Sequence, residues 1–163
     1  MIANAVGEIP DQARMLLDIA HRNSDRLLLL INDILDISKL ESEEMPFNIR
    51  NVKVASLLRS AIANNQAYAD KYGVTLVLES CPEDLTLPID GDRIMQVLSN
   101  LISNAAKFSH PSSSIQIKAT QDSNTVRIIV RDEGSGIPEE FQARIFEKFT
   151  QAKQEGKLSL IHI

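Results

Sequence analysis

Small and apolar residues repeat along residues 10–41 at spacings that alternate between four and three. The repeat comprises Ala13, Leu17, Ala20, Ser24, Leu27, Ile31, Ile34 and Ser38. This spacing predicts one long helix with a seam of the coiled-coil or bundle type. Pro10 suits its first turn, where a missing N–H costs little. Further apolar positions widen the stripe, which predicts more than one neighbour; an ordinary amphipathic helix docked on its own domain is the alternative.

From about residue 47 the pattern changes to short alternating runs that flank helical stretches. Helices are expected at 54–72, 91–108 and 138–149, and strands at 47–52, 74–80, 85–90, 114–120 and 125–132. A turn at 121–124 makes the last two strands a hairpin, and Ile115, Ile117 and Ala119 share one face of the first of them. We therefore predict an α+β fold with a mixed sheet and helices on one face.

The stretch ESEEMPFN separates these two patterns. It is charged, and Pro46 stops the preceding helix. We expect a partial helical hairpin in residues 1–45, with MIANAV as the end of a truncated partner helix and GEIPD as its loop. Residues 46–163 form the second domain.

Composition excludes several classes of function. The chain has 163 residues, of which 44% are hydrophobic, so it can bury a core. A net charge of −5 and the lack of a strongly basic run argue against a nucleic-acid surface. The single cysteine, Cys81, excludes an internal disulfide and a cysteine metal cluster. The longest apolar run, residues 27–31, is far short of the about 20 residues of a membrane span. With no secretory signal, we expect a cytoplasmic segment without membrane contact.

The helix at 91–108 carries polar side chains of an unusual kind. Asn100, Asn104 and Lys107 fall within a sector about 60° wide. Beside it lies a broad apolar face made of Ile94, Val97, Leu98, Leu101, Ile102, Ala105 and Phe108. Asparagine is a mediocre helix former, so two of them in mid-helix need a reason. Simple exposure to solvent is one reason, and binding of a ligand is the other.

Asp132 ends the alternating run of residues 125–132. It has the parity of Val126, Ile128 and Val130, so we expect it to point inward. A buried carboxylate needs a donor, which could be a protein side chain, a helix N-terminus or the exocyclic amine of a purine. The glycines in DEGSGIP let backbone approach a flat ring and adopt positive φ. GxxxxGK[ST] and a third glycine at dinucleotide spacing are both absent.

Three motifs in order, NLISNAAKFS, DEGSGIP and FEKFTQA, resemble the catalytic ATP-binding domain of sensor histidine kinases. The stretch RLLLLINDILDISKLESEE resembles the second helix of their dimerisation bundle, and the likeness covers residues 1 to about 152. It implies an α/β sandwich ATPase domain that uses ATP and Mg²⁺. It also implies a homodimer formed through the bundle and a response regulator receiver domain as partner, and it leaves open an inner-membrane anchor in the parent protein.

The resemblance assigns roles at the phosphate end of the site. Asn104 matches the ligand of the nucleotide's Mg²⁺, and Lys107 matches the lysine that neutralises phosphate charge. Asn100 matches a catalytic position near the metal and phosphates, where related ATPases such as DNA gyrase carry a general-base glutamate. An amide cannot act as a base. This fits transfer to a histidine, because imidazole attacks without losing a proton.

The resemblance also assigns the purine end. Asp132 matches the carboxylate that accepts a hydrogen bond from the adenine amine, and Phe108 matches an aromatic residue beside the ring. The other matches are the first glycine box (Gly134, Gly136), an apolar pocket wall (Ile137) and the F box under the mobile ATP lid (Phe146, Phe149). Plain core packing is the alternative for the two phenylalanines.

The sequence departs from the family at both ends. His21, His110 and His162 lack the context of the phosphoacceptor, which we expect upstream of Met1. No second glycine box follows Ala152, and KLSLIHI matches nothing in the family, so its native origin stays open. We therefore expect that this chain alone binds nucleotide weakly and does not autophosphorylate. Two other hypotheses remain: a relative in the same superfamily (a gyrase-type or chaperone-type ATPase, or an anti-sigma-type kinase) and a non-catalytic dimerisation or scaffold module.

Overall fold

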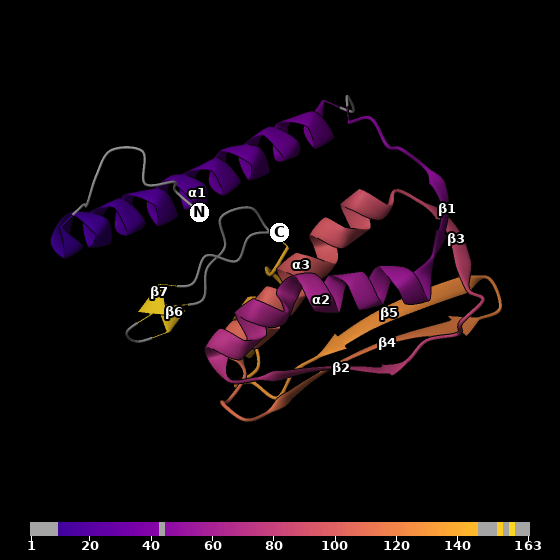
Figure 1. Cartoon of the computed structure of the whole chain (residues 1–163). Helices are drawn as coiled ribbons and strands as arrows, with labels where there is room; N and C mark the ends of the chain where they lie inside the picture. Colours follow the sequence, from indigo (N-terminus) through magenta and orange to yellow (C-terminus); the bar gives the residue numbers. More distant parts are fainter. Residues whose placement is uncertain (1–9, 43–44, 147–152, 155–156, 159–163) are drawn as a thin grey trace. The chain divides into compact units, whose positions relative to one another are not determined.

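The computed structural model describes residues 10–42, 45–146, 153–154 and 157–158 (Figure 1). The chain divides into two compact units, Met1–Pro46 and Phe47–Ile163. Each unit is described by itself. No helix in the described ranges combines the length and apolarity that a membrane span requires.

The first unit contains one long helix, α1 (Asp11–Glu41), which confirms the helix expected at 10–41. Asp11 lies in its first turn and Lys39 in its last, so both charges interact favourably with the helix dipole. The large apolar side chains described on α1 are between 38% and 65% exposed, apart from the half-buried Ile37. His21 is exposed as well. The expected partner helix in residues 1–9 lies outside the described residues.

The second unit is built on a mixed sheet, as predicted. Strand β2 (Thr75–Ser80) pairs in parallel with β4 (Ser114–Asp122), and β4 pairs antiparallel with β5 (Thr125–Arg131). The hairpin closes through a two-residue loop in which Ser123 has φ 48°. Positive φ is uncommon for a residue other than glycine, and loops of this length favour it.

A second antiparallel ribbon stands apart from this sheet. It joins β1 (Arg50–Lys53) to β3 (Thr86–Ile89). A short ladder of β6 (Lys153–Gln154) and β7 (Lys157–Leu158) ends the described chain. The expected strands are therefore confirmed, although they form two pieces of sheet and β1 starts later than residue 47.

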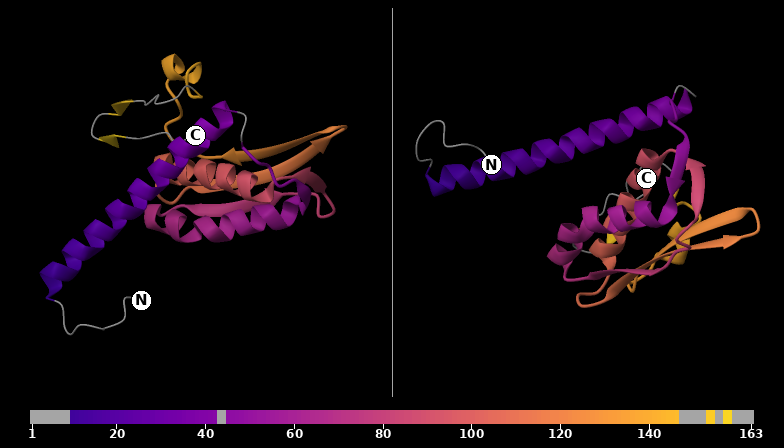
Figure 2. Two further views of the ribbon diagram at one scale, coloured as in Figure 1. Left: turned by 90° about the horizontal axis from the view of Figure 1, so that it is seen from above. Right: turned by 45° about the vertical axis from the view of Figure 1, so that its right-hand side comes forward.

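Helices α2 (Val54–Tyr72) and α3 (Gly91–Phe108) cover one face of the sheet, as Figures 1 and 2 show. The alternation of β4 explains which face is covered. Ile115, Ile117 and Ala119 are buried under the helices, and the alternate positions are half-buried or exposed. The α+β class and the one-sided arrangement of helices are thus confirmed.

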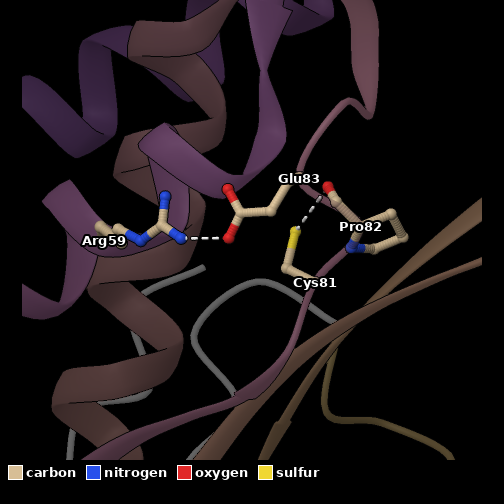
Figure 3. A network of polar contacts seen from close by, with 4 residues as sticks. All are labelled: Arg59, Cys81, Pro82 and Glu83. Atoms are coloured by element: carbon tan, nitrogen blue, oxygen red, sulfur yellow. Dashed lines mark hydrogen bonds and ion pairs between the residues drawn. The ribbon is translucent and has the colours of Figure 1, made fainter.

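The loop between β2 and β3 is fastened to α2 (Figure 3). Arg59 of α2 forms an ion pair with Glu83, and the Cys81 thiol donates to the carbonyl of Pro82 at 3.6 Å. Burial raises the pKa of this thiol. Leu85 is buried, and its carbonyl accepts from the N–H of Val54 at 2.9 Å. This bond satisfies a donor that the first turn of α2 leaves open.

The helix expected at 138–149 is wrong in length. Only α4 (Glu139–Gln142) is helical, and turns follow up to Phe146. Phe146 is 81% exposed, so the segment has little apolar packing to support it. Short helices are marginal without such packing. Phe149 and residues 147–148 lie outside the described residues.

Candidate functional site

Helix α3 carries the candidate site, and its first turn is held by Asp90. The Asp90 Oδ1 accepts from the backbone N–H groups of Asp92 and Arg93, both at 3.1 Å. Its Oδ2 accepts from the N–H of Asn48 at 2.8 Å. These hydrogen bonds hold the pKa of Asp90 below its usual value, and the bond from the Asn48 N–H has the largest effect. The role of Asp90 was not predicted from the sequence, although an aspartate directly before a helix is a strong N-cap signal.

A buried amide joins α3 to α2. Asn65 of α2 donates through Nδ2 to the carbonyl of Ala61 at 2.8 Å and to the hydroxyl of Ser99 at 3.3 Å. Buried side-chain amides are retained where they find such partners. This contact has no signal in the sequence, because an asparagine in mid-helix looks the same whether it is exposed or bonded across to another helix.

The predicted polar sector of α3 exists. Asn100, Asn104 and Lys107 are half-buried, and Phe108 beside them is half-buried too. The Lys107 ammonium lies over the Phe108 ring, 5.0 Å from its centroid. This cation–π contact keeps a positive charge on the face that carries the asparagines.

The predicted apolar face of α3 is narrower than expected. Its buried centre is formed by Leu98, Ile102 and Ala105. Val97 and Leu101, which belong to the predicted apolar face, are 51% and 48% exposed. By their positions on the helix they lie on the edge of the face next to Asn100 and Asn104. The asparagines are therefore bordered by accessible apolar side chains.

The end of α3 meets the DEGSGIP loop. An isolated antiparallel bridge pairs Ser109, directly after the helix, with Gly134. A methyl group at Gly134 would lie 2.6 Å from the carbonyl oxygen of Phe108 and 2.8 Å from Asp132 Oδ1. Such distances are too short for any side chain, so only glycine permits this approach. The structure thus brings two of the three predicted motifs together.

The expectation that Asp132 points inward is wrong. Strand β5 ends at Arg131, so the alternation that we extended to Asp132 no longer applies there. The side chain is exposed, and its Oδ1 accepts from the N–H of Gly134 at 2.8 Å. This is the turn that aspartate forms with the residue two positions on. Asp132 is therefore not a buried carboxylate that needs a donor, but an accessible carboxylate beside the end of α3.

The two glycines of the loop have different reasons to be glycine. Gly134 has no room for a side chain, as described above. Gly136 has φ +73°, and a methyl group there would have no atom within 4 Å. Its requirement is therefore conformational. Ile137, which follows, is exposed.

One further polar group lies at this junction. Within the described part of the chain, the Ser109 hydroxyl is the buried side-chain polar atom that lacks a hydrogen-bond partner. A buried hydroxyl without a partner costs about 1–3 kcal/mol.

An open hollow lies elsewhere, at the turn end of the hairpin. It is lined by Thr120, Asp122, Thr125 and Arg127 and contains none of the motif residues.

The chain is similar to known proteins in sequence. Residues 89–161 match the family described as histidine kinase-, DNA gyrase B-, and HSP90-like ATPase. The circadian input-output histidine kinase CikA of Synechococcus elongatus is 31% identical over 149 residues, which are 90% of this chain and 20% of that protein. The sensor histidine kinase WalK of Bacillus subtilis is 30% identical over 150 residues, 91% of this chain and 24% of WalK. The chain thus spans a quarter or less of these relatives.

Solved structures agree. The catalytic domain of histidine kinase ThkA is 30% identical with a TM-score of 0.60, and the match covers 69% of this chain and 73% of that one. Full-length ShkA in complex with AMPPNP is 27% identical with a TM-score of 0.78, covering 88% of this chain and 31% of ShkA. The chain therefore belongs to the sensor histidine kinases and contains the catalytic ATPase domain of that family.

Proposed function

We propose that the chain is the ATP-binding part of a protein-histidine kinase in two-component signalling. The γ-phosphoryl group of Mg-ATP is transferred to a histidine of the dimerisation bundle, and then to an aspartate of a response regulator. One observation carries this proposal: the bridge between Ser109 and Gly134 brings the DEGSGIP loop against the C-terminal end of α3, the helix that carries Asn100 and Asn104. A single ligand can therefore touch both motifs.

Two relatives support the ligand and the partner. The structure of full-length ShkA is a complex with AMPPNP, an ATP analogue. A structure of ThkA shows it in complex with the response regulator protein TrrA. ThkA is 26% identical in this comparison, with a TM-score of 0.67, and the match covers 88% of this chain and 42% of that one. By analogy, we infer a nucleotide on this chain and a receiver domain as its partner.

At the purine end, Asp132 accepts a hydrogen bond from the adenine amine. Its exposure suits this role, because a carboxylate that receives a ligand must be reachable from solvent. The Asp132 Oδ1 is used by Gly134, and Oδ2 is directed to the ligand in this proposal. The open space around Gly136 admits a flat ring, and Phe108 and Ile137 supply apolar contacts.

At the phosphate end, the Asn104 side chain holds Mg²⁺ and Lys107 pairs with the phosphates. The donor set fits a metal that arrives with the nucleotide. In the described ranges no three His, Cys, Asp or Glu side chains are grouped to hold a metal, and Mg²⁺ commonly takes phosphate oxygens, water and one or two protein oxygens. When bound, Mg²⁺ neutralises phosphate charge. Asn100 orients the same region and, being an amide, removes no proton from an attacking water.

The first unit supplies dimerisation in this proposal. We infer that residues 1–45 belong to the dimerisation and phosphoacceptor hairpin, and residues 46–163 to the catalytic domain. The exposed apolar side chains of α1 support this inference, because they need a partner to become buried. The same feature would suit a scaffold without turnover, so nucleotide binding decides between the two functions.

The test is a calorimetric titration of the chain with AMPPNP, with and without Mg²⁺. Asp132→Asn keeps the side-chain shape but turns an amide donor toward the adenine amine, so affinity should fall about tenfold or more. Asn104→Ala should abolish the gain that Mg²⁺ gives. Asp122→Asn, which changes an exposed aspartate at the hairpin turn, is the matched control and should bind as the wild type does. If the wild-type chain shows no binding of AMPPNP in this titration, with or without Mg²⁺, the scaffold function is favoured instead.

A further inference from the structure

Asp90 uses both of its carboxylate oxygens, and the two oxygens hold different parts of the chain. Oδ1 caps α3 through Asp92 and Arg93, and Oδ2 holds the N–H of Asn48, 42 residues away in sequence. The residue is only 8% exposed. A plain N-cap needs one oxygen, so the second bond calls for a separate explanation.

The register of the β1–β3 ribbon explains why the second bond is needed. The ladder ends at the pair Arg50–Ile89. Continued by two residues beyond the start of β1, the same register would set Asn48 opposite Gly91. Gly91 already belongs to α3, so its backbone no longer continues the ladder. The Asp90 carboxylate instead accepts the hydrogen bond from the Asn48 N–H that a strand carbonyl would otherwise accept. A methyl group at Gly91 would lie 3.4 Å from Val52 Cγ2, so β1 also packs against the first turn of α3.

Asn48 lies where the chain enters the second unit, which begins at Phe47. The chain that arrives from the first unit is therefore bonded directly to the start of α3. At 1.5 Å per residue, Asn100 and Asn104 lie about 15 and 21 Å farther along the same helix. A helix is stiff over this length, so a change of direction at its start moves both amides.

We propose that Asp90 is a positioning residue that couples the entry segment at Phe47–Asn48 to α3, and thereby sets where Asn100 and Asn104 lie. The inference rests on the proposed function only in the use of these two amides by the nucleotide. A change in the entry segment alters the direction of α3 through this carboxylate, without any contact to the nucleotide.

Asp90→Asn separates the coupling from the cap. The amide oxygen satisfies the two N–H groups of α3, which outnumber the single N–H of Asn48, so the amide nitrogen faces Asn48 and breaks that bond. Asp90→Ser is a second variant, since serine is also a good N-cap but is too short to reach Asn48. The matched control is Asp92→Asn, which removes one negative charge from the same turn and keeps all three hydrogen bonds to Asp90.

The first measurement uses the chain without nucleotide. Amide hydrogen exchange at Asn48 and the side-chain NH₂ resonances of Asn100 and Asn104 are recorded by NMR. In Asp90→Asn and Asp90→Ser, Asn48 should exchange faster and both NH₂ pairs should shift, with neither change in Asp92→Asn. Unchanged NH₂ resonances despite faster exchange at Asn48 would show the bond to be local and overturn the proposal. Retained protection of Asn48 in both variants would overturn it as well.

The second measurement is the affinity for Mg-AMPPNP. It should fall roughly 2- to 30-fold in Asp90→Asn, the range typical of changes that act through a packed element, while the Asp92→Asn affinity stays at the wild-type value. Failure of the proposed function would look different. The wild-type chain would then bind no nucleotide, whereas the NMR shifts of Asn100 and Asn104 would still report the coupling.

Discussion

Helices α1 and α3 carry the same kind of apolar repeat, yet only α3 buries it within the described chain. On α3, Ile102 is fully buried between α2 and the sheet. On α1, Leu27 and Ile31 are 58% and 44% exposed. The repeat therefore shows which side chains share a face, but not what covers that face. For α3 the cover is α2 and the sheet, and for α1 we infer a second copy of the chain.

The largest expected effect comes from charging the α1 seam. Leu27→Asp combined with Ile31→Asp would put carboxylates into an apolar interface, and the dimer dissociation constant should rise at least about 100-fold. Sedimentation velocity measures the change. Asn23→Asp, off the seam of the same helix, should leave the dimer intact, and all three chains should melt alike in the second unit. A wild-type chain that sediments as a monomer would remove the partner we infer for α1.

The next effect tests the buried side of the comparison. Ile102→Ala removes a fully buried side chain from α3 and should lower the free energy of unfolding by about 2–5 kcal/mol. Val97→Ala, on the exposed edge of the same helix, should cost less than about 0.5 kcal/mol. Urea unfolding followed by circular dichroism compares them. Similar losses at both positions would mean that the face is buried more evenly than the structure has it.

The smallest expected effects separate the two glycines that meet the end of α3. Gly134→Ala places a methyl group 2.6 Å from a backbone oxygen, so we expect a loss of about 1–3 kcal/mol as the loop moves off the helix. Gly136→Ala has space but keeps a strained φ, at roughly 1–2 kcal/mol.

Asparagine tells the two causes apart in the same unfolding experiment. It tolerates positive φ, so Gly136→Asn should be milder than Gly136→Ala. Gly134→Asn should be no milder than Gly134→Ala, because the contact with Phe108 remains. The reverse order would mean that the reasons we assign to the two glycines are exchanged.

Local signals in the sequence predicted most of the elements. The end of α2 is an example, because Gly73 follows it with φ +67°, the conformation that ends helices at glycine. The burial of Ile115 and Ile117 likewise followed from alternation along β4. These features depend on neighbours within a few residues, which the sequence displays directly.

Features that depend on distant contacts were predicted poorly. The prediction that Asp132 points inward was wrong because the direction of this side chain depends on where β5 ends. That end is set by pairing with β4, which lies elsewhere in the sequence. The exposure of Val97 depends on how far α2 reaches over α3. The bond from Asn48 to Asp90 joins residues 42 apart and leaves no periodic trace. The roles of Asn100, Asn104, Lys107 and Asp132 at the nucleotide stay predictions.

The most direct test of the central claim is an NMR map of Mg-AMPPNP binding on the isotope-labelled chain. The account predicts the largest shifts at the backbone amides of Ser109 and Gly134 and at the side-chain amide of Asn104, with little change at Ser123 in the hairpin turn or along α1. Shifts centred on the hairpin turn, or none at Ser109 and Gly134, would contradict the claim that the α3–loop junction holds the nucleotide.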